Sequence, residues 1–241
     1  MSRRAFAYLS TVVATIGLAA GSASAGPSPT TGPMWSGFYV GGHVGYGTGA
    51  DTGCGAWNGG MTMLPVSHAA DCSANPNDPN NHNYSIYGPF KGWLGGLQVG
   101  DNFQFGSFVI GAEFAASLSG LEHSNTSPLV TEKTGPLVTA TLHAGFAPGP
   151  LYFYGLVGFG AATQTHDDNT SNCHWSIGVG GPVYGAGIQT KVGSKVSLFG
   201  EWNRLAFNET SATCYNGSVN TNNLVKTNAD IFKVGVNFQI N

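Results

Sequence analysis

The chain has 241 residues, with 9 lysines and arginines against 12 aspartates and glutamates, and a formal net charge of −3 at neutral pH. Charged residues make up only 9% of the chain, whereas a soluble domain carries about a quarter. The few basic residues are not clustered, so a nucleic-acid-binding surface is excluded. Beyond the N-terminal segment no run of about 18 apolar residues occurs, so a helical membrane protein is excluded as well.

The first 25 residues have the pattern of a secretory signal peptide. Arg3 and Arg4 precede an apolar stretch at 5–20, and Ala23-Ser24-Ala25 fits the small-x-small cleavage rule. A membrane anchor is the alternative, but the apolar run is short and contains Ser and Thr. We therefore expect cleavage after Ala25, a periplasmic leader at 26–34, and one domain at 35–241.

The last segment, 230–240, shows a clear two-residue period. Its even positions from Phe232 onward are large and apolar, and its odd positions from Lys233 onward are polar or glycine. Because successive side chains of a strand point to opposite faces, this pattern predicts a strand with one apolar face. The length suits a tilted strand that crosses a bilayer. The side chains expected to face lipid are Phe232, Val234, Val236, Phe238 and Ile240.

The same period recurs upstream and predicts eight strands in all. The predicted strands are 38–47, 93–103, 108–116, 138–146, 151–161, 182–190, 195–204 and 230–240. Long connections (48–90, 117–136, 164–176, 207–229) alternate strictly with short ones (104–107, 147–150, 191–194). A β-sandwich has no reason to sort its loops by end, whereas an outer-membrane barrel has short periplasmic turns and long extracellular loops.

These patterns predict an all-β fold: an eight-stranded antiparallel up-and-down barrel in the outer membrane of a Gram-negative bacterium. In hydrocarbon every backbone polar group needs an internal partner, so the sheet must close. We expect 230–240 to pair with 38–47. Outer-membrane lipid and lipopolysaccharide are the expected surroundings.

Several strand segments resemble the alphaproteobacterial Omp25/Omp31-type outer-membrane immunogenic proteins, an OmpA-like porin family. The resemblance lies in WSGFYVGG (35–42), GGLQVGDNFQ (95–104), VIGAE (109–113), YGAGIQ (184–189), SLFGEW (197–202) and FKVGVNF (232–238). It implies a barrel and an outer-membrane location more than an activity. The chain departs from the family at Asp101, where an aromatic residue is usual, and at Asn241, where a terminal aromatic guides the barrel-assembly machinery. We expect either that Phe238 or Ile240 provides that cue or that assembly is slower.

Four cysteines, Cys54, Cys72, Cys173 and Cys214, all fall in predicted long loops. An even count in an exported protein favours two disulfides. Of the three possible connectivities, we favour Cys54–Cys72 with Cys173–Cys214, because only this one keeps the close pair together. A metal site is the alternative, but no C-x-x-C or H-x-x-x-H spacing supports it.

Polar residues at inward positions are the candidate functional residues of the lumen. They are His43, Gln98, Glu113, His143, Gln189, Glu201, Asn203 and Lys233. One interpretation is a narrow ion or solute path gated by Glu113, Glu201 and Lys233. The interpretation we favour is a filled interior, because eight strands leave room only for side chains. Buried charges need partners, so we expect Lys233 to pair with Glu201.

Other functions have weaker support in the sequence. The resemblance raises haemin binding, but the histidines assigned to loops, His68, His82, His123, His166 and His174, follow no pattern. No Ser/His/Asp set occupies one predicted face in catalytic order, so we expect no enzyme activity, no catalytic residues and no cofactor. The favoured function is a structural and surface-antigen barrel whose loops meet host or phage ligands, and the alternative is a narrow passive porin.

Overall fold

The computed structural model describes residues 35–57, 89–124, 130–168, 173–208, 210–215 and 220–240. The expected signal peptide, the leader and Cys72 lie outside these residues. No helix in the described part of the chain is long and apolar enough to span a membrane.

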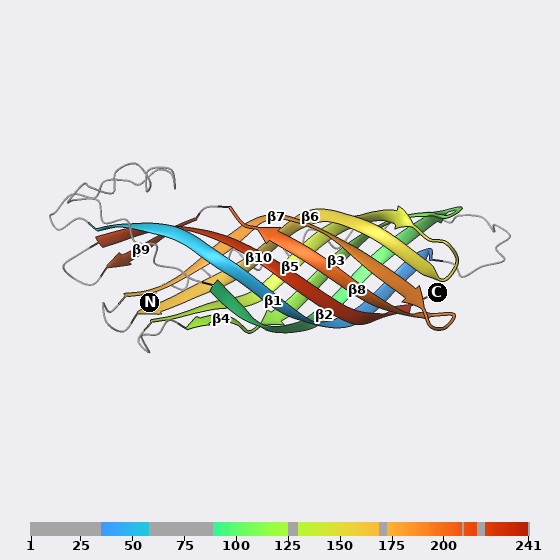
Figure 1. Cartoon of the computed structure of the whole chain (residues 1–241), viewed down its shortest axis with the longest axis horizontal. Coiled ribbons are helices and arrows are strands. Elements are labelled where there is room, and N and C mark those ends of the chain that lie inside the picture. The colour runs from blue at the N-terminus through green and yellow to red at the C-terminus, as the bar shows by residue number, and fades with distance from the viewer. Residues whose placement is uncertain are drawn as a thin grey trace. The chain divides into compact units, whose positions relative to one another are not determined.

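The described chain is almost entirely strand, and Figure 1 shows the strands running at a common tilt. The strands are β1 (Gly37–Trp57), β2 (Pro89–Phe105), β3 (Phe108–Ser119), β4 (Leu121–Ser124), β5 (Val130–Phe146), β6 (Leu151–Asp168), β7 (Cys173–Lys191), β8 (Val196–Ala206), β9 (Thr210–Tyr215) and β10 (Asn220–Gln239). After a break at Gly120, β4 continues β3 along β5, and β9 pairs only with the first part of β10. The remaining eight strands form the wall of the barrel.

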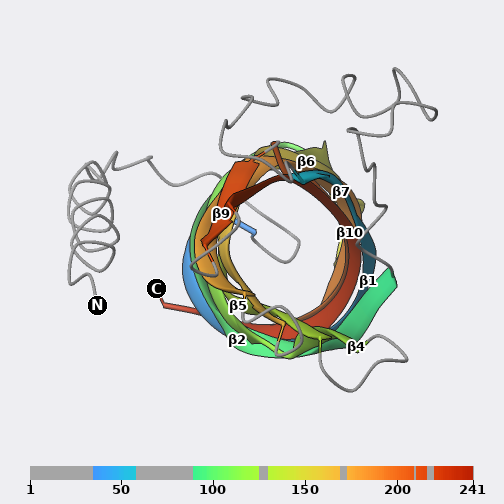
Figure 2. The same ribbon diagram turned by 90° about the vertical axis from the view of Figure 1, so that its left-hand side faces the viewer.

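The sheet closes on itself because β1 pairs antiparallel with both β10 and β2. The expected pairing of the last strand with the first is confirmed, with Val44 opposite Val234. Figure 2 looks toward one end and shows the strands closing into a ring. The residues paired with Gly47 can be followed from strand to strand once around the barrel. This series returns to β1 at Gly37 and not at Gly47, so the strands are sheared as well as tilted.

The two faces of the wall follow the predicted alternation. Outward side chains such as Trp93 and Leu97 are 70% and 73% exposed, which suits contact with lipid. On the same strand the inward side chain of Gln98 is only 2% exposed. The structure places Phe232, Val234, Phe238 and Ile240 among the exposed hydrophobic residues and buries Lys233. The eight-stranded antiparallel barrel predicted from the sequence is therefore confirmed.

The predicted short connections are also present. The chain turns at Gly106 and at Gly149, whose φ angles of 61° and 69° suit glycine, and bends at 192–195. We call this side of the barrel the turn end and the opposite side the loop end. In outer-membrane barrels the turn end faces the periplasm.

The predicted long loops were wrong in their extent, because the strands continue well past the apolar band. Residues 117–119 and 130–136 belong to β3 and β5, and all but 169–172 of the expected loop 164–176 belongs to β6 and β7. Consequently Cys54, Cys173 and Cys214 lie in β1, β7 and β9, not in loops as expected. His123, His166 and His174 likewise lie in strands. The cysteine pairing stays a prediction.

A row of outward aromatic residues marks the loop-end edge of the apolar band. Trp93, Tyr46, Phe232 and Trp202 stand side by side on β2, β1, β10 and β8. Two positions nearer the loop end, the same strands carry Lys91, Thr48, Asp230 and Arg204. Arg204 Nη1 and Asp230 Oδ2 form an ion pair of 2.5 Å. An aromatic row beneath a polar row is the pattern of a membrane–water interface.

Candidate functional site

The centre of the barrel holds a buried ion pair between two neighbouring strands. Lys233 Nζ on β10 lies 2.6 Å from Glu201 Oε1 on β8, and the two residues are directly opposite in register. Asn203 Nδ2 donates to the same oxygen at 2.8 Å, and the Tyr154 hydroxyl donates to Glu201 Oε2 at 2.9 Å. Both oxygens of Glu201 therefore have partners, as a buried carboxylate requires.

Two rows with the same order of residues, tyrosine, glycine and glutamate, cross the wall of the barrel. Tyr154 stands opposite Gly187, which stands opposite Glu201. A Cβ atom built on Gly187 would lie 2.4 Å from the ring of Tyr154, so the ring lies over the glycine to reach the carboxylate. Glycine at the middle position is thus required by close approach.

The second row repeats this arrangement on the strands β1, β2 and β3. Tyr39 stands opposite Gly100, which stands opposite Glu113, and the Tyr39 hydroxyl donates to Glu113 Oε2 at 2.8 Å. A Cβ atom on Gly100 would again lie 2.4 Å from the tyrosine ring. The two rows bring Glu113 and Glu201, which come from separate strands, to the same level of the lumen.

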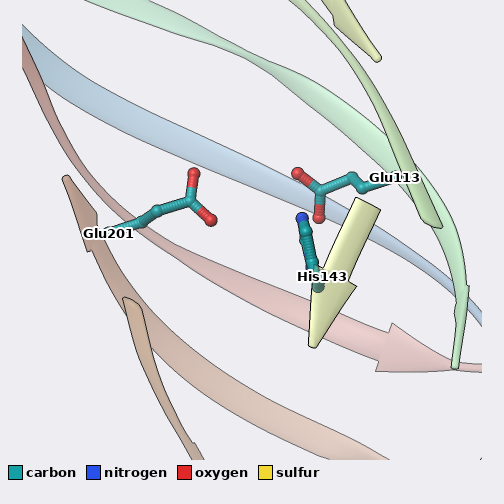
Figure 3. A group of neighbouring side chains, drawn as sticks. All are labelled: Glu113, His143 and Glu201. Carbon is teal, nitrogen blue, oxygen red and sulfur yellow. The ribbon is translucent and has the colours of Figure 1, made fainter. Parts of the chain in front are cut away.

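His143 completes this central group, which Figure 3 shows with both carboxylates pointing toward the imidazole. One ligand-type atom from each of Glu113, His143 and Glu201 lies within 4.8 Å of the others. The His143 ring stacks on Tyr154 at 5.0 Å between centroids, and its Nε2 lies 3.0 Å from Thr141 Oγ1. The sequence identified these three residues, and the structure brings them together.

A divalent metal such as zinc suits these donor types but not their surroundings. Zinc binds nitrogen and carboxylate oxygen at about 2.0–2.2 Å, so the donors would have to move inward. Lys233 already places a positive charge on Glu201, and a metal ion beside it would be repelled. The residues present therefore fit an ion pair held by lysine better than a metal centre.

A second hydrogen-bonded chain links Ser117, His43 and Gln98. Ser117 Oγ lies 2.8 Å from His43 Nε2, and His43 Nδ1 lies 2.5 Å from Gln98 Oε1. Gln98 Nε2 donates onward to Asn237 Oδ1 at 2.7 Å. Because the Gln98 oxygen accepts the hydrogen of His43 Nδ1, the lone pair of His43 Nε2 faces the Ser117 hydroxyl. The order of serine, histidine and hydrogen-bond acceptor is that of a catalytic triad. The sequence missed it, because Ser117 lies one residue beyond the predicted strand.

This chain is sealed from substrate. Ser117, His43 and Gln98 are 7%, 5% and 2% exposed. A nucleophilic serine needs room for a reacting carbonyl and for donors to an oxyanion. The arrangement therefore serves as an internal hydrogen-bond chain across β1, β2 and β3.

Side chains also close the turn end of the lumen. The Trp35 ring packs against Tyr152 at 5.5 Å between centroids, and its Nε1 donates to the Gly149 carbonyl at 3.2 Å. Lys191 Nζ lies 5.2 Å from the centre of the Trp35 ring and donates to Gln239. Gln189, another residue expected in the lumen, donates to Ser197 Oγ at 2.6 Å.

On the loop-end side, an apolar layer covers the polar centre. A Cβ atom built on Gly45 would contact both Lys233 and Leu94, and one on Gly47 would contact Leu121 and Ile231. The layer therefore begins directly beside the ion pair. Its inward side chains, each at most 5% exposed, are Leu94, Leu121, Leu137, Val183, Leu205, Phe207, Ala229 and Ile231.

Above this layer lies a further inward polar group that the sequence missed entirely. Glu132, Gln164, His166 and Thr227 are each at most 8% exposed, and Trp175 stacks on His166. All five positions fall in segments that were expected to be loops. The only signal was that inward polar residues continue at a spacing of two beyond the apolar band.

A model of a protein family covers almost the whole chain. Residues 11–239 match the family described as outer membrane protein beta-barrel domain. The chain belongs to this family. It is thus a bacterial outer-membrane β-barrel protein of the Gram-negative type, whose loop end is the extracellular side. No curated protein matches it.

The chain is similar to several solved outer-membrane barrels at low sequence identity. Ail from Yersinia pestis is 14% identical, with 82% of this chain and 99% of Ail covered and a TM-score of 0.38. Neisserial surface protein A is 14% identical, with coverages of 85% and 98% and a TM-score of 0.43. The protease OmpT from Escherichia coli is 6% identical, with coverages of 84% and 97% and a TM-score of 0.48. At these values none of the three bears on function.

Proposed function

We propose that this protein is a non-conducting outer-membrane barrel with a structural and surface-antigen role. The apolar layer above the ion pair carries the proposal. Ile231 and Leu205 are each 2% exposed, and Leu94 is 4% exposed. An apolar constriction excludes water and therefore ions. Below this layer, Glu201 and Lys233 form a buried ion pair. Opening a path between them would leave buried charges without their partners.

Conductance in planar lipid bilayers tests this role. We expect the wild-type protein to give no steps. The double variant Leu94→Ala/Ile231→Ala, which thins the apolar layer, should give small steps if that layer is the barrier. A shift in gel mobility between boiled and unboiled samples shows that each sample is a folded barrel. Reproducible wild-type steps would contradict the proposal.

A narrow passive porin is the second candidate, because Glu113, Glu201 and Lys233 place charges at the centre of the lumen. For this function the wild-type protein would conduct and Glu201→Ala would abolish the steps. The comparison of the two variants therefore separates the candidates: thinning the apolar layer tests a closed barrel, and removing Glu201 tests a charged gate.

Membership of the Omp25/Omp31-type subgroup is part of the proposal and rests on the strand segments named above. The matching partners are lipid and lipopolysaccharide around the apolar band, and the barrel-assembly machinery during biogenesis. The outward charges of Lys91 and Arg204 above the aromatic row support contact with anionic headgroups. Export through a cleaved signal peptide and recognition of the loops by host or phage ligands complete the proposed role.

Haemin or metal binding through loop histidines has less support. His68 and His82 lie outside the described residues, and His166 is inward and 6% exposed. His174 Nδ1 lies 3.0 Å from Asp167 Oδ1, within an exposed pair. We propose no enzyme activity, because the Ser117–His43–Gln98 chain has no access for substrate.

A further inference from the structure

Three inward residues form a row across neighbouring strands at the extracellular mouth of the barrel. Glu132 on β5 stands opposite His166 on β6, which stands opposite Trp175 on β7. Glu132 Oε1 lies 2.8 Å from His166 Nδ1, and the rings of His166 and Trp175 stack at 5.1 Å with an angle of 7°. The row is therefore held rigidly, within a few residues of where these strands end.

Two polar atoms in this row have no hydrogen-bond partner among the described residues. They are Glu132 Oε2 and Trp175 Nε1, and both are buried. Glu132 is 8% exposed as a residue. Leaving a buried polar group unpaired costs about 1–3 kcal/mol, and more for a charged one. A group that pairs with both atoms would recover this cost.

Both residues line one small cavity, together with Phe90, Leu121 and Gln164. Its free space suits one water molecule or one hydroxyl group. Phe90 and Trp175 give the cavity aromatic walls, and Leu121 separates it from the ion pair below. The cavity is part of the mouth and not of the central group.

The two unpaired atoms define the chemistry of the occupant. The carboxylate of Glu132 accepts hydrogen bonds, whereas the indole nitrogen of Trp175 only donates one. A metal ion or an ammonium group cannot accept the indole hydrogen, and an anion would be repelled by the carboxylate. A hydroxyl group donates and accepts at once, and it fits the space. The required ligand group is thus a hydroxyl.

We propose that this mouth cavity binds the primary hydroxyl of a sugar, with the sugar ring outside the cavity. The hydroxyl donates to Glu132 Oε2 and accepts from Trp175 Nε1. Because the cavity is one hydroxyl deep, a protruding hydroxymethyl group fits and a ring hydroxyl does not. This site is independent of whether the barrel conducts.

Indole NMR signals test the site directly in the full-length folded barrel in micelles. The chain has five tryptophans, and loss of one signal in Trp175→Phe identifies the Trp175 indole. Methyl β-D-glucopyranoside should shift this signal saturably. Methyl β-D-xylopyranoside, which lacks only the hydroxymethyl group, should bind about tenfold or more weakly, since a hydrogen bond to a charged group is lost.

Glu132→Gln should weaken glucoside binding, whereas Glu122→Gln should not, because Glu122 forms an exposed pair with Lys133 on the outer face. If the Trp175 signal does not shift at any glucoside concentration, water is the occupant and the proposal is overturned. Equal binding of glucoside and xyloside would also overturn it. Once Trp175→Phe has assigned the indole signal, both sugars are compared on the wild-type protein. Silence or steps in the bilayer experiment would not change either result.

Discussion

Glu201 and Glu132 are both inward carboxylates buried to a similar degree, but they have different partners. Glu201 has a hydrogen-bond or ion-pair partner on each oxygen, including the ammonium of Lys233. Glu132 has a partner on one oxygen, His166, its other oxygen has none among the described residues, and the residue lines a cavity. The centre of the barrel is thus saturated, whereas the mouth keeps unused hydrogen-bonding capacity. This contrast separates a region that stabilises the fold from one that can bind a ligand.

The largest expected difference in stability between the two regions comes from removing each carboxylate in turn. Glu201→Ala leaves the buried ammonium of Lys233 without its partner, so we expect a loss of about 3–5 kcal/mol in the free energy of unfolding. Glu132→Ala removes the hydrogen bond to His166, so we expect a loss of only about 1–3 kcal/mol. Urea unfolding in micelles, followed by tryptophan fluorescence, measures both.

The matched control for this pair is Glu122→Ala. Glu122 and Lys133 lie 3.7 Å apart with side chains 50% and 58% exposed, so we expect a loss below about 1 kcal/mol. Equal losses for Glu201→Ala and Glu132→Ala would contradict the distinction between the two regions.

A second test asks whether Lys233 takes the place of a cation in the central group. Lys233→Met removes the ammonium and retains Glu113, His143 and Glu201, whose ligand-type atoms lie within 4.8 Å of one another in this protein. We expect Zn²⁺ to stabilise this variant, by about 2.7 kcal/mol at a hundredfold excess over its dissociation constant. Thermal unfolding with and without Zn²⁺ measures the effect.

The same Zn²⁺ concentration should leave the wild-type protein unchanged, because Lys233 repels the ion. Lys233→Met/His143→Ala should lose the response. A wild-type response as large as that of the variant would show that the lysine does not exclude the metal.

The smallest effect concerns the tyrosine hydroxyls of the saturated region. Tyr154→Phe removes a hydrogen bond to the charged Glu201, so we expect a loss of about 1.5–3 kcal/mol in unfolding free energy. Tyr152→Phe is the matched control, because its hydroxyl makes only a 3.5 Å contact with the Val109 carbonyl. If the two variants lose the same stability, the tyrosine–carboxylate bond does not contribute as described.

The sequence predicted the membrane-spanning part of the fold well, since lipid on one face imposes a strict two-residue period. It also predicted the Lys233–Glu201 pair, because both residues were assigned to inward positions on neighbouring strands and a buried charge needs a partner. It failed where the strands leave the apolar band. There the outward positions that alternate with Glu132, His166 and Trp175 are polar or charged. Periodicity of hydrophobicity carries no information once neither face is in lipid.

Contacts between strands that are not neighbours could not be predicted either. Tyr39 reaches Glu113 over Gly100, and this depends on the shear of the barrel, which sets the residue opposite each position. Ser117 joined His43 only because β3 continues past the predicted end. The alternation assigned these residues to a face, but their partners required the register.

The rings that lie over Gly100 and Gly187 have a consequence for how this sequence can change over time. In each case one strand supplies a large side chain and its neighbour supplies none, so the volume belongs to the pair. A methyl group added at Gly100 would collide with the Tyr39 ring, whereas a smaller residue at position 39 would leave a void. Tolerated changes should therefore come as compensating exchanges on adjacent strands, and related barrels should show these position pairs varying together.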